Sequence, residues 1–143
     1  MVVGLPISDN YYQHLVQRIY QRTDYDFVGV ALQDEFYPYS IRWRFVAGNQ
    51  NERFRKIILR RGFGIAGLVL RTGKPFVGND LSRFAYSGEM YTPIAVAESL
   101  HSAVALPLKS NIGMVNGVVL AGYRDDRTIK QSAISKLAKY LQR

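Results

Sequence analysis

A glycine-rich segment near the middle of the chain carries the clearest pattern for binding chemistry. Gly62-Phe63-Gly64-Ile65-Ala66-Gly67 follows an apolar run and precedes residues that favour a helix. Glycines let the backbone approach a ligand closely, and the first turn of a helix offers unpaired N–H donors at the positive end of its dipole. Further along, Thr92 is placed to cap a second helix and Pro93 to occupy its first position, with Ile94 next. If the fold brings both helix starts to one pocket, their amides can hold a small monoanion without a buried Lys or Arg.

The same glycines formally match the dinucleotide-binding pattern G-x-G-x-x-G. That pattern requires a crossover helix of about ten or more residues leading to a parallel strand, whereas Gly73 and Pro75 end the helix here after two turns. The neighbouring segments predict antiparallel hairpins, so a dinucleotide site is not favoured. An anion site and a structural role, in which the glycines only permit tight packing of the helix, both stay open.

The residue types that the chain lacks exclude several kinds of chemistry. It contains no cysteine, which removes disulfides, thiolate metal sites, iron–sulfur clusters and cysteine nucleophiles, because each needs sulfur. Only His14 and His101 can supply imidazole, and a catalytic zinc usually has three protein ligands. We therefore expect no metal site, no cofactor and no enzymatic activity.

The net charge of +8 is concentrated in one segment. Between positions 42 and 61 there are seven Lys and Arg residues and a single acid, Glu52. Such a segment suits a phosphate backbone, the mouth of an anion site or an acidic protein surface, and it also suits a solvated face. No nucleic-acid-binding motif accompanies the charge. We expect a solvated or partner-docking face, with Arg53, Arg55 and Lys56 as docking candidates, and no nucleic-acid partner.

The elements that must position these residues are mostly short strands between an amphipathic first helix and an amphipathic last helix. Ser8 or Asp9 is predicted to cap the first helix and Thr128 the last. Predicted strands and short helices lie between them: strands at 27–32, 40–46, 57–59, 76–78, 102–108 and 114–123, a two-turn helix ended by Gly73, and a helix over 93–98. In the strand 40–46, period-two alternation places Ile41, Trp43 and Phe45 on one face. Antiparallel sheet with helices packed on it is the natural architecture, and no linker divides the chain.

Several of these segments together resemble a GAF domain. They are 27–32, 41–46, the stretch Arg60 to Pro75 with its G-x-x-G…T-G-K-P pattern, and the hairpin from Ala103-Val104-Ala105-Leu106-Pro107-Leu108 to Gly117-Val118-Val119-Leu120. The resemblance covers nearly the whole chain. It implies a single GAF domain over residues 1–143, of the α+β class, with a central antiparallel sheet, the N- and C-terminal helices on one face and short pocket helices on the other.

Within that superfamily the chain resembles the nitrate-receptor type, through Ile41-Arg42-Trp43, the segment 47–53 and the Pro93-Ile94 helix start. The resemblance implies a cytoplasmic protein that binds nitrate and acts on a sensor histidine kinase of a two-component system. It also implies a set of ligand-binding residues: backbone groups of Gly64, Ile65, Ala66 and Ile94, and a wall of Trp43, Pro93 and Tyr91. Here Tyr91 stands one place before the position where an aromatic residue is expected, and Thr92 takes that position.

Other functions are consistent with the same residues. A GAF fold alone does not determine a ligand, so a nucleotide or another organic metabolite in a signalling or transcriptional regulator is the alternative. Free-methionine-sulfoxide reductases resemble this fold but work through cysteine, which is missing here. Trp43 could equally fill the core. The first and last helices can cover the sheet or pack across a homodimer, and no apolar run is long enough to span a membrane.

Overall fold

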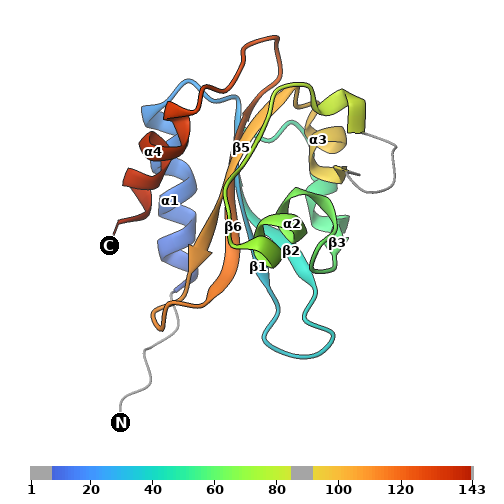
Figure 1. Ribbon diagram of the computed structural model, residues 1–143, viewed down its shortest axis with the longest axis vertical. Helices are drawn as coiled ribbons and strands as arrows, with labels where there is room; N and C mark the ends of the chain where they lie inside the picture. The colour runs from blue at the N-terminus through green and yellow to red at the C-terminus, as the bar shows by residue number, and fades with distance from the viewer. Residues whose placement is uncertain (1–7, 85–91, 143) are drawn as a thin grey trace.

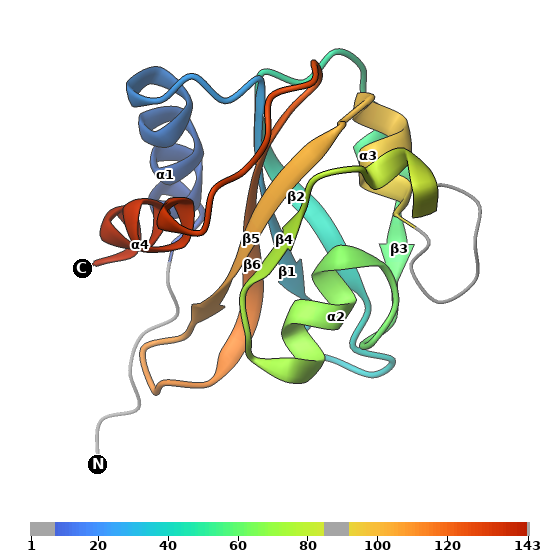
Figure 2. The same ribbon diagram turned by 45° about the horizontal axis from the view of Figure 1, so that its top comes forward.

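The computed structural model describes residues 8–84 and 92–142, in which a six-stranded sheet lies between two layers of helices (Figures 1 and 2). Every neighbouring pair of strands is antiparallel, in the order β3-β2-β1-β6-β5-β4. The strands are β1 Phe27–Gln33, β2 Ile41–Ala47, β3 Ile58–Leu59, β4 Phe76–Gly78, β5 Ser102–Lys109 and β6 Val115–Tyr123. The β1–β2 and β5–β6 hairpins confirm the two predicted from the sequence, and pairing of β1 with β6 joins them into one sheet.

The helices divide between the two faces of the sheet as predicted (Figure 2). One face carries α1 Asp9–Arg22 and α4 Ser132–Ala138, and the other carries α2 Gly64–Thr72 and α3 Pro93–Glu98. Short 3-10 turns complete the elements: η1 Arg53–Lys56, η2 Leu81–Phe84 and η3 Lys139–Leu141. None of the helices within 8–84 and 92–142 combines the length and apolar character that crossing a membrane requires.

Strand β1 supplies apolar side chains to both layers because successive residues of a strand point to opposite faces. Val28 and Val30 pack with α1, whereas Phe27 and Ala31 pack with α2 and α3, and all four are buried. The continuous apolar run that predicted a strand covered on both faces is therefore confirmed. The sheet has two cores, one on each side.

The predicted alternation along β2 is wrong at Phe45. Ile41 and Trp43 lie in the core with α2, but Phe45 packs on the opposite face, where its ring stacks on Tyr12 with centroids 5.7 Å apart. The pairing with β1 shifts between Val30 and Ala31, so Arg44 is an extra residue in the ladder. An inserted residue of this kind inverts the period-two pattern beyond it.

The start of the last helix also differs from the prediction. Thr128 does not cap it: α4 begins at Ser132, after an extended segment. The backbone N–H of Ile129 donates to Asn79 Oδ1 at 2.6 Å, and the Asn79 side chain donates to the carbonyl of Ile129 at 3.2 Å. These bonds hold the backbone beside the sheet, and the side chain that makes them lies far away in the sequence.

The glycine pattern of α2 has a packing role at Gly67. A Cβ at this position would lie 2.4 Å from the carbonyl oxygen of Arg60, in the turn that precedes the helix. The Gly62 N–H also donates to the Gly67 carbonyl at 2.8 Å. Part of the structural role considered for these glycines is thus confirmed, because a side chain would push the helix away from its turn.

We expect Gly67→Ala to destabilise the fold, although alanine favours a helix over glycine by about 1 kcal/mol. The clash is with backbone and should cost about 1–3 kcal/mol net. The free energy of unfolding in urea, compared with that of the unaltered chain, measures the effect. A gain in stability would contradict the close approach of α2 to the Arg60 carbonyl.

Candidate functional site

The first turn of α2 is buried against the sheet with its amides unpaired. Phe63 occupies the N-cap in an extended conformation, and Gly64 turns the chain into the helix with φ +67°, a conformation that favours glycine. Gly64, Ile65 and Ala66 are all buried. Within the described residues, neither the Ile65 nor the Ala66 N–H donates to an acceptor outside the helix. Such amides are the donors that a helix start offers to an anion.

Helix α3 begins in the same layer. Thr92 is its N-cap residue and Pro93 its first residue, as predicted, and the carbonyl of Thr92 accepts from the N–H of Val96 at 3.1 Å. The Thr92 side chain, however, makes no capping hydrogen bond. The prediction is therefore right for the position and wrong for the hydroxyl.

Most of the predicted ligand-binding residues share one core, between α2, α3 and the inner face of β1 and β2. Trp43, Ile65, Ala66 and Ile94 all belong to this cluster of buried apolar side chains. Figures 1 and 2 show α2 and α3 on the same side of the sheet. Gly64 is buried next to the cluster, with Leu59 against it, and Pro93 is half-buried. Tyr91 lies outside the described residues.

Two buried polar atoms, one on β2 and one at the start of α3, have no hydrogen-bond partner among the described residues. Trp43 is 2% exposed and Thr92 is 0% exposed, yet the indole Nε1 and the hydroxyl Oγ1 are both unpaired. Leaving a buried donor or acceptor unsatisfied costs about 1–3 kcal/mol, so such groups call for an explanation. Sequence reasoning treated Trp43 as an apolar wall and Thr92 as a cap, and no local pattern distinguishes those roles from donors to a ligand.

Trp43 occupies space that a glycine leaves free on the neighbouring strand. A Cβ at Gly29 would lie 3.2 Å from the Trp43 ring and 3.0 Å from the ring of Phe27. The indole is therefore fitted closely over β1, and its orientation leaves Nε1 without an acceptor among residues 8–84 and 92–142. The sequence contained this signal only as a single glycine inside an apolar strand.

The far end of α3 is held by a polar network that the sequence did not predict. Glu98 is 0% exposed, and its Oε1 accepts from the N–H of Gln50 at 2.9 Å and from Arg124 at 2.5 Å. Asn51 Nδ2 donates to the carbonyl of Ala97 at 2.6 Å, and Arg124 also donates to the carbonyl of Gly48 at 3.0 Å. These bonds tie the carboxyl end of the helix to the loop at 48–51 and to Arg124, while Glu98 Oε2 has no hydrogen-bond partner among the described residues. At the opposite end, the Ile94 N–H donates to no described residue.

Replacing Arg124 should show how much this network contributes to the free energy of unfolding. Arg124→Met leaves the buried Glu98 carboxylate without its cation, and we expect a loss of about 3 kcal/mol in the free energy of unfolding. Arg42→Met is the matched control, because the Arg42–Asp34 pair is exposed at 45% and 37% and should contribute less than about 1 kcal/mol. Equal losses in the two variants would contradict the anchoring role of Arg124.

We compared the chain with known protein families, curated sequences and solved structures. No family model and no curated protein sequence matches the chain. Among solved structures, the chain is similar to a Staphylococcus aureus NreA protein mutated in its nitrate-binding site, with 37% identity, a TM-score of 0.75, and coverage of 86% of this chain and 90% of that one. A hypothetical protein from S. aureus is 36% identical with a TM-score of 0.73, covering 84% of this chain and 98% of that one.

A more distant structure supports the fold alone. A GAF domain/HD domain protein from Geobacter sulfurreducens is 16% identical, with a TM-score of 0.72 over 93% of this chain and 86% of that one. The six-stranded antiparallel sheet with helices on both faces thus matches a GAF fold, and the identity with the Staphylococcus structure is high over most of both chains. The chain belongs to the NreA family of GAF-domain proteins.

Proposed function

We propose that this protein is a nitrate sensor that binds its ligand between the starts of α2 and α3. The observation that carries the proposal is the unpaired Nε1 of buried Trp43, in the same core cluster as Ile65, Ala66 and Ile94. The 37% identical NreA structure is of a protein that was mutated in a nitrate-binding site. In the proposed site the amides of Ile65, Ala66 and Ile94 donate to the anion together with the indole N–H.

Nitrate suits donors of this kind better than most anions do. Its single charge is spread over three oxygens, so neutral N–H groups and an apolar wall replace its hydration shell at modest cost. Each helix start adds about 0.3–1 kcal/mol, and up to about 2 kcal/mol when partly buried. A divalent anion loses much more solvation on entering an uncharged core. No Lys or Arg side chain is buried among the described residues, so none lies in the core to compensate a second charge.

We further propose that the Thr92 hydroxyl faces the ligand. It replaces an aromatic residue expected at that position, is wholly buried, and does not cap its own helix. A hydroxyl donates to an anion oxygen where an aromatic ring would supply only a wall. The role of Tyr91 in the site stays a prediction from the resemblance.

The proposed output is a change in the affinity for a cytoplasmic sensor histidine kinase. The loop at 48–51 holds the carboxyl end of α3 and leads directly into η1, where Arg53, Arg55 and Lys56 are exposed. A shift of α3 on ligand binding would therefore reach this basic turn, which suits an acidic partner surface. The partner and the cytoplasmic location rest on the resemblance, and a homodimer rests on the amphipathic first and last helices.

A nucleotide or other organic metabolite stays the alternative ligand, for which copurifying ultraviolet-absorbing material would be the first sign. An enzyme of the sulfoxide-reductase type is not proposed, because the sequence has no thiol to act as the nucleophile.

Isothermal titration with nitrate, chloride and sulfate tests the main proposal. We expect saturable heat with nitrate and none with sulfate. Trp43→Phe keeps an aromatic ring and removes the N–H, so nitrate affinity should fall about tenfold or more, as loss of a hydrogen bond to a charged group predicts. Lys74→Gln, which neutralises an exposed lysine away from the core cluster, is the control and should bind as before. Absence of nitrate heat at millimolar ligand would defeat the proposal.

Thr92→Val separates a ligand contact from an unpaired hydroxyl without function. Valine has a similar shape, so the ligand-free protein should become more stable by about 1 kcal/mol as the unsatisfied group disappears. Nitrate affinity should fall about tenfold if the hydroxyl donates to the ligand. Urea unfolding and calorimetric titration of the same variant measure both quantities. Greater stability with unchanged nitrate affinity would show that Thr92 has no role in binding.

A further inference from the structure

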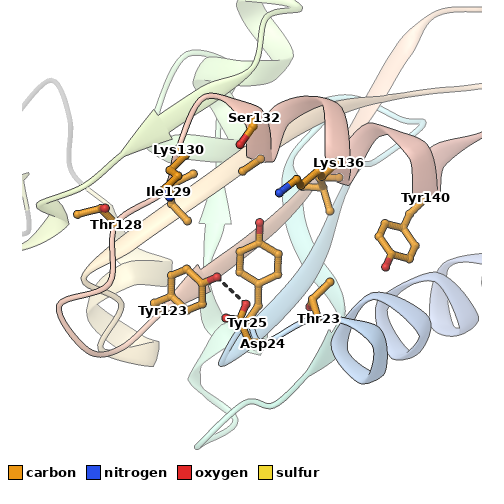
Figure 3. A pocket seen from close by; sticks show the side chains of 12 residues that line it. Thr23, Asp24, Tyr25, Tyr123, Thr128, Ile129, Lys130, Ser132, Lys136 and Tyr140 are labelled. Carbon is orange, nitrogen blue, oxygen red and sulfur yellow. Dashed lines mark hydrogen bonds between the residues drawn. The ribbon is translucent and has the colours of Figure 1, made fainter.

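A cavity of about 450 Å³ lies on the other face of the sheet from Trp43, between α4 and the ends of β1 and β6 (Figure 3). Ile129 and Leu137 are its buried apolar lining, and Tyr25, Tyr123 and Tyr140 are its aromatic lining. This volume is within the range of sites that hold small organic molecules. The proposed nitrate site uses none of these residues.

The aromatic wall of the cavity is held in place by contacts of its own. The rings of Tyr25 and Tyr123 stack with centroids 5.0 Å apart and an interplanar angle of 30°. The Tyr123 hydroxyl donates to Asp24 Oδ1 at 2.6 Å, and the Arg127 guanidinium lies 4.1 Å from the centre of the Tyr123 ring. A wall fixed in this way loses little conformational entropy when a ligand binds.

The charges around the cavity favour an anion. Its only carboxylate among the described residues is that of Asp24, which already accepts from Tyr123 and lies 3.5 Å from Arg127. Lys130 and Lys136 also line the cavity, and neither makes an ion pair with a described residue. The cavity lining therefore combines two lysines that have no ion-pair partner among the described residues with one carboxylate that is already paired.

A hydroxyl donor complements these cations. Figure 3 shows the hydroxyl of Tyr25 and the ammonium of Lys136 pointing into the same space between α4 and the tyrosines. The Tyr25 hydroxyl donates to no described residue. Burial, followed by the charge of Asp24 and the nearby Tyr140, raises the pKa of Tyr25, so the phenol keeps its proton at neutral pH and can donate it to a ligand.

We propose that this cavity is a second binding site, which takes a small aromatic carboxylate. Lys136 and Tyr25 supply the donors for the carboxylate group, since a charge-assisted pair of this kind is stronger than one between neutral groups. Tyr140 and Leu137 supply the apolar surface for the ring. The site is independent of nitrate, because a whole sheet separates the two sets of residues.

Titration of the full chain with benzoate, followed by calorimetry and by backbone amide NMR, tests this proposal. We expect saturable binding at millimolar ligand, with the amide shifts centred on Tyr25 and Lys136. Benzamide has the same ring and no charge, and it should bind about tenfold more weakly. Lys136→Gln should weaken benzoate binding by a similar factor, and Tyr25→Phe should weaken it less while leaving the ring in place.

Lys74→Gln makes the same charge change at an exposed position outside the cavity, and benzoate affinity should be unaltered in it. Saturating nitrate should also leave benzoate affinity unchanged. The proposal is overturned by equal binding of benzoate and benzamide, by equal weakening in the two lysine variants, or by shifts centred on Ile65 and Ile94 with competition from nitrate. A failure of nitrate to bind would leave this result intact, since the two sites share no residue.

Discussion

Burial of both faces of a single sheet is the constraint on which the rest of this structure depends. Strand β1 carries apolar side chains on both faces, and its pairing with β6 joins the two hairpins into one sheet. Both faces of this sheet must therefore be shielded from water. Helices α1 and α4 cover one face, and α2 and α3 cover the other. Because α2 and α3 are too short to cover a face singly, they share it. Side chains from the first turns of both helices, Ile65 and Ala66 of α2 and Ile94 of α3, therefore belong to the same core cluster.

The proposed nitrate site depends on neutral donors, because the basic residues that dominate the sequence between positions 42 and 61 are not buried. Trp43 contributes an indole N–H to the buried apolar cluster. The two ends of helix α3 also differ in their polar contacts. The ion pair of buried Glu98 with partly exposed Arg124 anchors its carboxyl end, whereas the Ile94 N–H at its start donates to no described residue. One end is thus anchored by the protein, and the other is the end that the proposed nitrate site uses.

The two faces of the sheet differ in chemistry as well as in cover. On the face with α2 and α3, the proposed nitrate site uses backbone and indole N–H donors beside a cluster of apolar side chains. The face with α1 and α4 has a cavity lined by tyrosines and by two lysines that form no ion pair with the part of the chain that the structure describes, and we propose it for a larger anion with an apolar body. A single sheet thereby separates two binding environments, and Lys136 and Trp43 cannot contact the same molecule.

Local patterns in the sequence determined most elements: the α+β class, both hairpins, the two-turn helix ended by Gly73 and the Thr92-Pro93 helix start all follow from periodicity and turn chemistry. Tertiary contacts decided the exceptions. An extra residue at Arg44 turned Phe45 to the other face, and Asn79 held the segment at Ile129 extended. The absence of an acceptor for Trp43 Nε1 and the pairing of Glu98 with Arg124 also belong to the tertiary structure. A residue's neighbours along the chain determine its backbone preference, whereas its partners in space, which no local pattern encodes, determine whether its polar atoms are satisfied or left for a ligand.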